Sequence, residues 1–271
     1  MSYDAVIFDV DGVLMDTRHS FTVAVLDAVA TATGSGRFTI GEVRQLKAIP
    51  GFNNDWHVAV AGAAWVSFCG ELSFSEFTQR IDGHGGGLPG LKKVVGKSLT
   101  TGFEARVIRL AQEAYGGTTA CRQLYGFEPQ TIRQAGRWRA ERPLLSPDRA
   151  AGFISRMGIV TGRDAAEMEL AFRRLGWRLP PEQLAVSRDM SLDKPNPAPL
   201  LAILAHLASE EALYAGDSRD DLELVRNARE AGARVDFCFI GAPPAPWSEV
   251  ELAFNSVNDL LDSIEVLHDE E

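Results

Sequence analysis

Short apolar runs alternate with helical patterns in this chain, and this alternation limits the possible folds more than any other feature. Helical patterns follow the later runs, at residues 164–175, 195–208 and 219–230. Apolar runs that alternate with helices are typical of strands buried on both faces of a parallel sheet. We therefore predict an α/β fold with a doubly wound parallel sheet. The runs are YDAVIFDV (3–10), RMGIVTGR (156–163), QLAVS (183–187), EALYAGDS (211–218) and ARVDFCFIG (233–241).

The alternation stops between residues 17 and 144, where several helical patterns occur without a comparable strand run. The glycine-rich stretch GHGGGLPG (83–90) reads as a loop. The simplest interpretation is a helical domain, residues 18–142, inserted into a discontinuous core of residues 1–17 and 143–271. The helical patterns cover residues 18–32, 40–48, 53–68, 75–81, 102–114 and 118–125.

Composition narrows the functional class. The 271 residues are enough for two domains, and 45% of them are apolar, as in an ordinary globular protein. The net charge of −10 argues against a nucleic-acid partner, because phosphate backbones bind clustered Lys and Arg. A small anionic substrate stays possible, since a few local cations and a metal can reverse the field at one site.

The cysteines and the apolar pattern predict a compartment. Cys69, Cys121 and Cys238 form no CxxC pair, so a disulfide framework is not expected. We see no signal-peptide pattern and no apolar stretch of transmembrane length. A cytoplasmic protein without a membrane partner is the expectation. The oligomeric state is left open.

Four polar clusters follow the predicted strands. In an open parallel sheet, ligands bind beyond the carboxyl ends of the strands. Each cluster alone could be an ordinary turn or helix cap, because Asp, Gly, Ser and Thr favour such positions. Their joint occurrence at one edge of one sheet favours a functional site. They are DVDG with Asp9 and Asp11, TGR with Thr161 and Gly162, DKPNP with Lys194, and GDSRDD with Asp217 and Asp221.

These clusters resemble the four signature motifs of the haloacid dehalogenase (HAD) superfamily. The resemblance covers the sheet-forming parts of the chain, about half of its length. The inserted helical stretch is similar to the helical cap that this family places between the first and second motifs. The resemblance implies a Rossmann-like core and a hydrolase of the phosphatase-like branch.

The resemblance also implies roles for individual residues. Asp9 would be the nucleophile that forms an aspartyl-phosphate. Asp11 would be the general acid for the leaving group and then the base for the attacking water. The Thr161 hydroxyl and the Gly162 N–H would bind phosphate oxygens, and Lys194 would offset the negative charge. The implied catalytic residues are thus Asp9, Asp11, Thr161 and Lys194.

A magnesium ion is the implied cofactor. It would be held by the Asp9 carboxylate, the Asp11 backbone carbonyl and Asp217, while Asp221 would act from outside or through water. True dehalogenases of this superfamily generally lack an acid at the second position and need no metal. Because this chain has Asp11 at the second position and both acids of the fourth cluster, Asp217 and Asp221, we favour phosphate esters over carbon–halogen bonds.

The helical insert contains a second polar cluster, Asn53, Asn54 and Asp55, followed by Trp56. One interpretation is an N-terminal helix cap beside a buried Trp. The other is a substrate-binding loop in which Asn53 and Asn54 contact hydroxyl or amine groups. The sequence leaves both open.

The leading functional hypothesis is a magnesium-dependent phosphatase for a small soluble phosphate monoester. Phosphoglycolate, a sugar phosphate and histidinol phosphate are candidate substrates. A phosphomutase of the same fold is the first alternative, because it would use the same four clusters. A binding protein that keeps the fold without turnover is the second.

Overall fold

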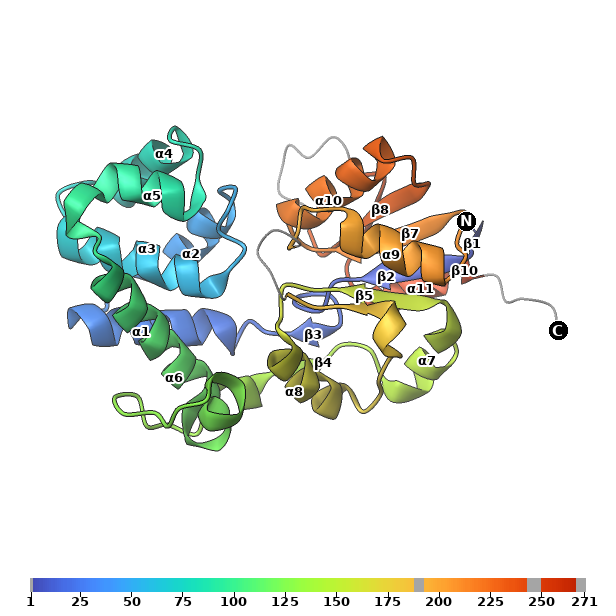
Figure 1. Cartoon of the computed structure of the whole chain (residues 1–271), viewed down its shortest axis with the longest axis horizontal. Coiled ribbons are helices and arrows are strands. Elements are labelled where there is room, and N and C mark those ends of the chain that lie inside the picture. The colour runs from blue at the N-terminus through green and yellow to red at the C-terminus, as the bar shows by residue number, and fades with distance from the viewer. Residues whose placement is uncertain (1, 188–192, 243–249, 267–271) are drawn as a thin grey trace. The chain divides into compact units, whose positions relative to one another are not determined.

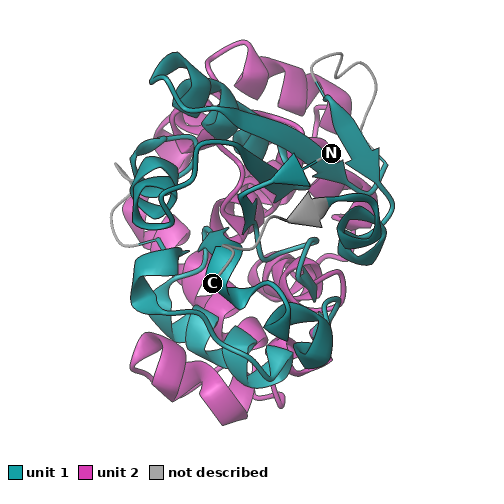
Figure 2. Ribbon diagram, turned by 90° about the vertical axis from the view of Figure 1, so that its right-hand side faces the viewer, with its two compact units in different colours: residues 1–16, 142–271 teal, residues 17–141 magenta. Residues whose placement is uncertain are grey.

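The computed structural model describes residues 2–187, 193–242 and 250–266, and the chain divides into two compact units (Figures 1 and 2). Unit 1 comprises residues 1–16 and 142–271, and unit 2 comprises residues 17–141. The chain leaves unit 1 after β3 (Met15–Asp16) and returns through β4 (Arg142–Pro143). These two short strands pair with each other antiparallel.

A parallel sheet forms the centre of unit 1. Among the described residues it has six strands in the order β6-β5-β2-β7-β8-β9, which confirms the predicted α/β fold. The last of them, β9, was not predicted; it is a short edge strand whose side chains are half-buried or exposed. The strands are β2 (Ala5–Phe8), β5 (Met157–Val160), β6 (Leu184–Ala185), β7 (Ala212–Gly216), β8 (Val235–Ile240) and β9 (Leu252–Phe254). A separate parallel pair joins β1 (Ser2–Tyr3) to β10 (Glu265–Val266).

Helices cover both faces of this sheet (Figure 1). Val6 and Phe8 of β2 point to one face, and Ala5 and Ile7 to the other, because successive side chains in a strand alternate. Both sets are fully buried, so β2 reads as a continuous apolar run. The first face packs against α7 (Pro147–Ala151), α8 (Ala165–Leu175) and α11 (Val257–Ser263), and the second against α9 (Ala198–His206) and α10 (Arg219–Glu230).

Unit 2 is helical, and no strand occurs in residues 17–141, all of which are described. Its central helix is α3, in which residues 58–65 are buried all round. Small side chains there allow close approach; a Cβ on Gly62 would lie 2.7 Å from the Phe38 ring. No helix in the described part of the chain is long and apolar enough to cross a membrane. The helices are α1 (Phe21–Thr33), α2 (Ile40–Lys47), α3 (Asp55–Phe68), α4 (Phe74–Asp82), α5 (Gly87–Val95) and α6 (Thr101–Tyr125).

Glycines account for one difference from the sequence prediction in unit 2 and for one predicted interruption between helices. The predicted loop at 83–90 is wrong for residues 87–90, because α5 begins at Gly87. Gly90 lets α5 pack closely, since a Cβ there would meet the Ile81 carbonyl oxygen at 2.6 Å. The two helices predicted at 102–114 and 118–125 are both present: α6 spans them and is interrupted between them at Gly117, whose φ of +55° is not helical.

Candidate active site

Three of the predicted site residues occupy equivalent places in the sheet. Asp9, Thr161 and Asp217 are each the first residue after a strand, namely β2, β5 and β7. Since β2 lies between the other two, these residues are at neighbouring strand ends. The Asp9 N–H still donates to the Ala215 carbonyl at 2.9 Å, and the Thr161 N–H to the Ala185 carbonyl at 3.0 Å. The sheet therefore fixes the backbone that carries the site.

Three carboxylates meet at this edge of the sheet. Asp9, Asp217 and Asp221 can each place one oxygen so that all three lie within 4.8 Å of one another. Gly12 makes room for this cluster, because a Cβ there would lie 1.9 Å from Asp217 Oδ2. Gly12 also has φ +79°, which favours glycine. Asp217, which belongs to the fourth sequence cluster, thus leaves room only for a glycine at position 12.

Lys194 links two of the carboxylates. Its Nζ lies 2.9 Å from Asp9 Oδ1 and 2.6 Å from Asp221 Oδ1, and the lysine side chain is only 3% exposed. Burial alone would lower the pKa of Lys194, but Asp221 and Asp9 outweigh burial and raise it well above the ordinary value. The lysine is therefore a fixed positive charge between two buried acids.

Asp221 is fully engaged by protein donors. Its Oδ1 accepts from Lys194 and from the Tyr214 hydroxyl, at 2.6 and 2.8 Å. Its Oδ2 accepts from the Ser218 hydroxyl and from the backbone N–H groups of Ser218 and Asp217, at 2.5, 3.1 and 3.3 Å. With both oxygens satisfied, Asp221 orients Lys194 and the turn at 217–218.

Asp11 contacts a residue to which the sequence analysis assigned no role. Arg163, the third residue of TGR, is 1% exposed and places Nη2 2.6 Å from Asp11 Oδ1. Its Nε lies 3.0 Å from the same oxygen and 3.3 Å from Oδ2. The available signal was an arginine directly after two phosphate-binding candidates at a strand end.

Thr161 and Gly162 present donors beside this pair. The buried Thr161 side chain accepts the Arg163 N–H through Oγ1 at 3.2 Å, which leaves the hydroxyl proton to donate elsewhere. Gly162 is exposed. This arrangement can hold the oxygens of an anion.

The protonation of Asp9 reflects its surroundings. Burial raises the pKa of Asp9 to about 7; Lys194 opposes this, while Asp221 and Asp11 add to it. Asp9 therefore keeps its proton to a higher pH than an ordinary aspartic acid does.

The predicted substrate-binding residues Asn53 and Asn54 belong to unit 2. Asn54 is the N-cap of α3, and its Oδ1 accepts the Trp56 N–H at 2.9 Å. The Trp56 ring packs against Phe21 and Tyr115, with centroid distances of 5.7 and 5.9 Å. Asn54 and Trp56 therefore have structural contacts of the kind that the capping interpretation requires. Asn53 is exposed. Both asparagines stay predicted substrate-binding residues.

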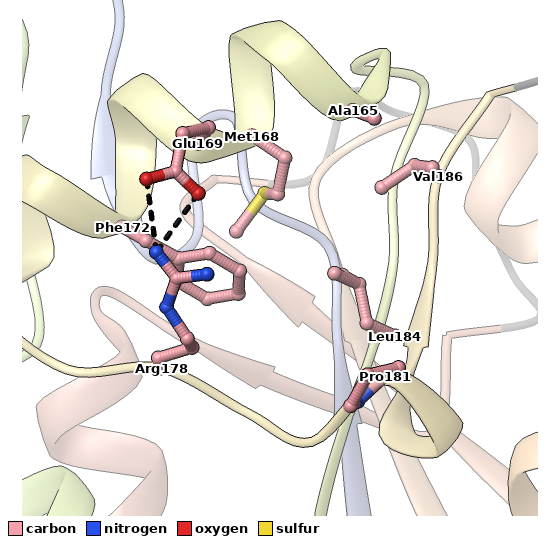
Figure 3. Close-up of a pocket in the computed structure, with 8 residues that line it drawn as sticks. All are labelled: Ala165, Met168, Glu169, Phe172, Arg178, Pro181, Leu184 and Val186. Carbon is pink, nitrogen blue, oxygen red and sulfur yellow. Dashed lines mark hydrogen bonds and ion pairs between the residues drawn. The ribbon is translucent and has the colours of Figure 1, made fainter.

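A small pocket of about 120 Å³ lies beside α8 and β6 (Figure 3). Apolar side chains and the Arg178–Glu169 ion pair, with a distance of 2.8 Å, form its walls. None of the residues predicted from the four clusters lines it. The pocket is lined by Ala165, Met168, Glu169, Phe172, Arg178, Pro181, Leu184 and Val186.

A comparison with known protein families shows to which family the chain belongs. The sequence profile of the haloacid dehalogenase-like hydrolases matches residues 3–229. The chain belongs to this family. The predicted superfamily and the predicted hydrolytic enzyme are thereby confirmed. None of the curated proteins is similar enough in sequence to count as a match.

Solved structures of this superfamily share the architecture. Phosphatase Tt82 from Thermococcus thioreducens is 25% identical, with a TM-score of 0.68 over 97% of this chain and 98% of that one. A predicted phosphoglycolate phosphatase from Haemophilus somnus is 15% identical, with a TM-score of 0.58 over 96% and 97%. A HAD-superfamily hydrolase of subfamily IA from Geobacter sulfurreducens is 17% identical, with a TM-score of 0.53 over 96% and 95%. The last two likenesses concern the fold alone.

The raised pKa of Asp9 predicts how stability depends on pH in the absence of divalent metal. Between the ordinary value of 3.8 and about 7, the folded state keeps a proton that the unfolded state releases. The contribution of Asp9 is thus greatest below this range and is lost as the pH rises through it. Urea unfolding at about pH 5 and about pH 7.5 should show this loss, and Asp9→Asn should flatten it. If the free energy of unfolding of Asp9→Asn changed with pH as much as that of the wild type, the raised pKa of Asp9 would be contradicted.

The cap at Asn54 makes a separate prediction for unit 2. Asn54→Ala should destabilise the chain by about 0.5–2 kcal/mol, because the Trp56 N–H loses its acceptor. Asn54→Asp keeps an acceptor oxygen and should retain the melting temperature. Asn53→Ala is the matched control, since that side chain is exposed. Equal melting temperatures for Asn54→Ala and Asn53→Ala would show that the cap contributes nothing.

Proposed function

We propose that this chain is a phosphatase that hydrolyses a small phosphate monoester by way of a phosphoryl group carried on Asp9. The observation that supports this most is the buried Asp9 carboxylate, held at 2.9 Å by Lys194 and placed beside Thr161 at the neighbouring strand end. Membership of the hydrolase family agrees with it. So does the similarity to a structure that is named a phosphatase.

In this proposal Asp9 attacks the phosphorus atom. Lys194 fixes the carboxylate and offsets charge as the phosphoryl group arrives. The Thr161 hydroxyl and the Gly162 N–H donate to phosphoryl oxygens, so that the group is held in line for displacement. The products of this half-reaction are an acyl phosphate on Asp9 and the leaving alcohol.

Asp11 handles the protons. As the bond from phosphorus to the leaving oxygen breaks, Asp11 gives its proton to that oxygen. It then takes a proton from the water that attacks the acyl phosphate on Asp9. Inorganic phosphate leaves, Asp9 is regenerated, and Asp11 is again protonated.

The acid cluster fits a divalent metal ion. Carboxylate oxygens are the ligands that Mg²⁺ prefers, and those of Asp9 and Asp217 can approach within 4.8 Å. Asp221 fits an outer role, because protein donors already engage both of its oxygens. We assign the ion to Asp9, Asp217 and the Asp11 backbone carbonyl. Bound Mg²⁺ would supply positive charge against the carboxylates and the phosphate.

The same groups would serve a phosphomutase, which differs in excluding water. A binding protein without turnover is less consistent with the complete set of Asp9, Asp11, Thr161 and Lys194.

Phosphoglycolate, a sugar phosphate and histidinol phosphate are the proposed substrates. A reducing compartment such as the cytoplasm suits the three free cysteines, two of which are buried.

A panel of phosphate esters tests the activity. We expect the wild-type protein with Mg²⁺ to release inorganic phosphate, and Asp9→Asn to lose nearly all of this release while keeping the fold. An isomerised ester would indicate the mutase instead. Neither product from any ester would favour the binding protein. Phosphate release and circular dichroism are the two measurements.

Metal exchange tests the cofactor. Chelation should abolish phosphate release, and Mg²⁺ should restore it. Ca²⁺ should restore it poorly, because it takes more ligands at longer distances and would shift Asp9. Calorimetric titration of the chelated protein with Mg²⁺ gives a second readout, in which Asp217→Ala should weaken binding. Full activity after exhaustive chelation would refute the metal assignment.

A further inference from the structure

Arg163 is the largest fully buried side chain among the described residues. Burying a charged group is costly unless it is paired and hydrogen-bonded, so this arginine requires a structural or functional reason. Both backbone polar groups of Arg163 are hydrogen-bonded. Its N–H donates to Thr161 Oγ1 at 3.2 Å, and its carbonyl accepts the Ser187 N–H at 2.9 Å. The next residue, Asp164, caps α8.

The guanidinium group meets Asp11 unequally. Within the described part of the chain, Asp11 Oδ1 accepts from two donors, Nη2 at 2.6 Å and Nε at 3.0 Å, whereas Oδ2 accepts from one, Nε at 3.3 Å. A guanidinium group has donors and no acceptor, so an oxygen that it holds closely must act as an acceptor. Oδ1 is thus occupied as an acceptor, and Oδ2 is the oxygen with room for a proton.

We propose that Arg163 is a positioning residue for Asp11, which fixes the carboxylate through Oδ1 and leaves Oδ2 to carry the catalytic proton. This inference rests on the phosphatase function proposed above. Oδ2 gives its proton to the leaving oxygen as the phosphorus–oxygen bond breaks, and it takes one from water when the acyl phosphate is hydrolysed. Arg163 keeps its own protons throughout.

A positioning role differs from a purely structural one in its dependence on the leaving group. An alkoxide needs a proton during bond cleavage, whereas a nitrophenolate does not. Loss of the Asp11 orientation should therefore slow alkyl esters more than aryl esters. A general loss of folded protein would slow both equally.

The test uses Arg163→Met and Arg163→Lys in the full chain with Mg²⁺. Single-turnover phosphorylation of Asp9 is measured with an alkyl phosphate and with nitrophenyl phosphate. Because general acid help is worth about a hundred- to ten-thousand-fold, we expect Arg163→Met to slow the alkyl ester about ten- to hundred-fold more than the aryl ester. Arg163→Lys keeps the positive charge but loses the planar pair of donors. Its alkyl-to-aryl rate ratio should lie between those of Arg163→Met and the wild type.

Arg178→Met is the matched control. Arg178 also pairs with a carboxylate, Glu169, at 2.8 Å, but it is 61% exposed and lies outside the proposed machinery (Figure 3). Its alkyl-to-aryl rate ratio should equal that of the wild type. If Arg163→Met fails to fold, as judged by its melting curve, Arg163→Lys decides the result.

A double variant completes the test. Adding Arg163→Met to Asp11→Asn should cause no further loss with the alkyl ester, since the group that Arg163 positions is already gone. Equal slowing of both esters, or fully additive losses in the double variant, would overturn the inference. A failure of the proposed function would look different, because the wild type itself would then release no phosphate or would release it equally well without Asp9.

Discussion

The site is organised by the ammonium group of Lys194 between two buried carboxylates. Asp9 directly follows β2, Asp221 lies in the first turn of α10, and Lys194 precedes α9, so one cation links three elements. Removing Lys194 would leave two buried carboxylates without their shared cation, and uncompensated buried charge is strongly destabilising. The same contact that positions the proposed nucleophile therefore also holds the carboxyl edge of the sheet together.

This arrangement requires an unusually close approach of backbone and side chains. A Cβ at Gly216 would lie 2.5 Å from the Cβ of Asp221, and one at Gly12 would meet Asp217. Both glycines lie directly beside an acid in the sequence, where they allow another part of the chain to come in. The buried strands hold these positions because helices cover both faces of the sheet.

The sequence was sufficient to predict the fold and to indicate where the site would lie. Parallel strands bring their carboxyl ends to one edge, so residues as distant as Asp9 and Asp217 could be grouped from the strand pattern alone. Arg163 could not be assigned in this way, because its pairing with Asp11 depends on the path of one long side chain. The second hydrogen bond to Asp221 Oδ1 likewise comes from Tyr214, which the pattern marks only as an apolar strand residue. The short strand β9 and the glycine-rich start of α5 carry too little periodicity to be recognised.

The balance of charge connects these observations with the proposed chemistry. The residues assigned to the site carry four carboxylates, Asp9, Asp11, Asp217 and Asp221, against two cations, Lys194 and Arg163. With four negative charges against two positive ones, the assigned groups are two positive charges short of neutrality when all four acids are ionised. Burial is the main cause of the raised pKa of Asp9, and the neighbouring acids Asp221 and Asp11 add to it. A divalent cation would offset the deficit without protonating Asp9, and would leave that carboxylate ionised to attack phosphorus. The carboxylates that crowd this edge of the sheet repel one another, and a divalent cation would reduce that repulsion. A nucleophilic Asp9 that depends on a metal ion is therefore consistent with this site.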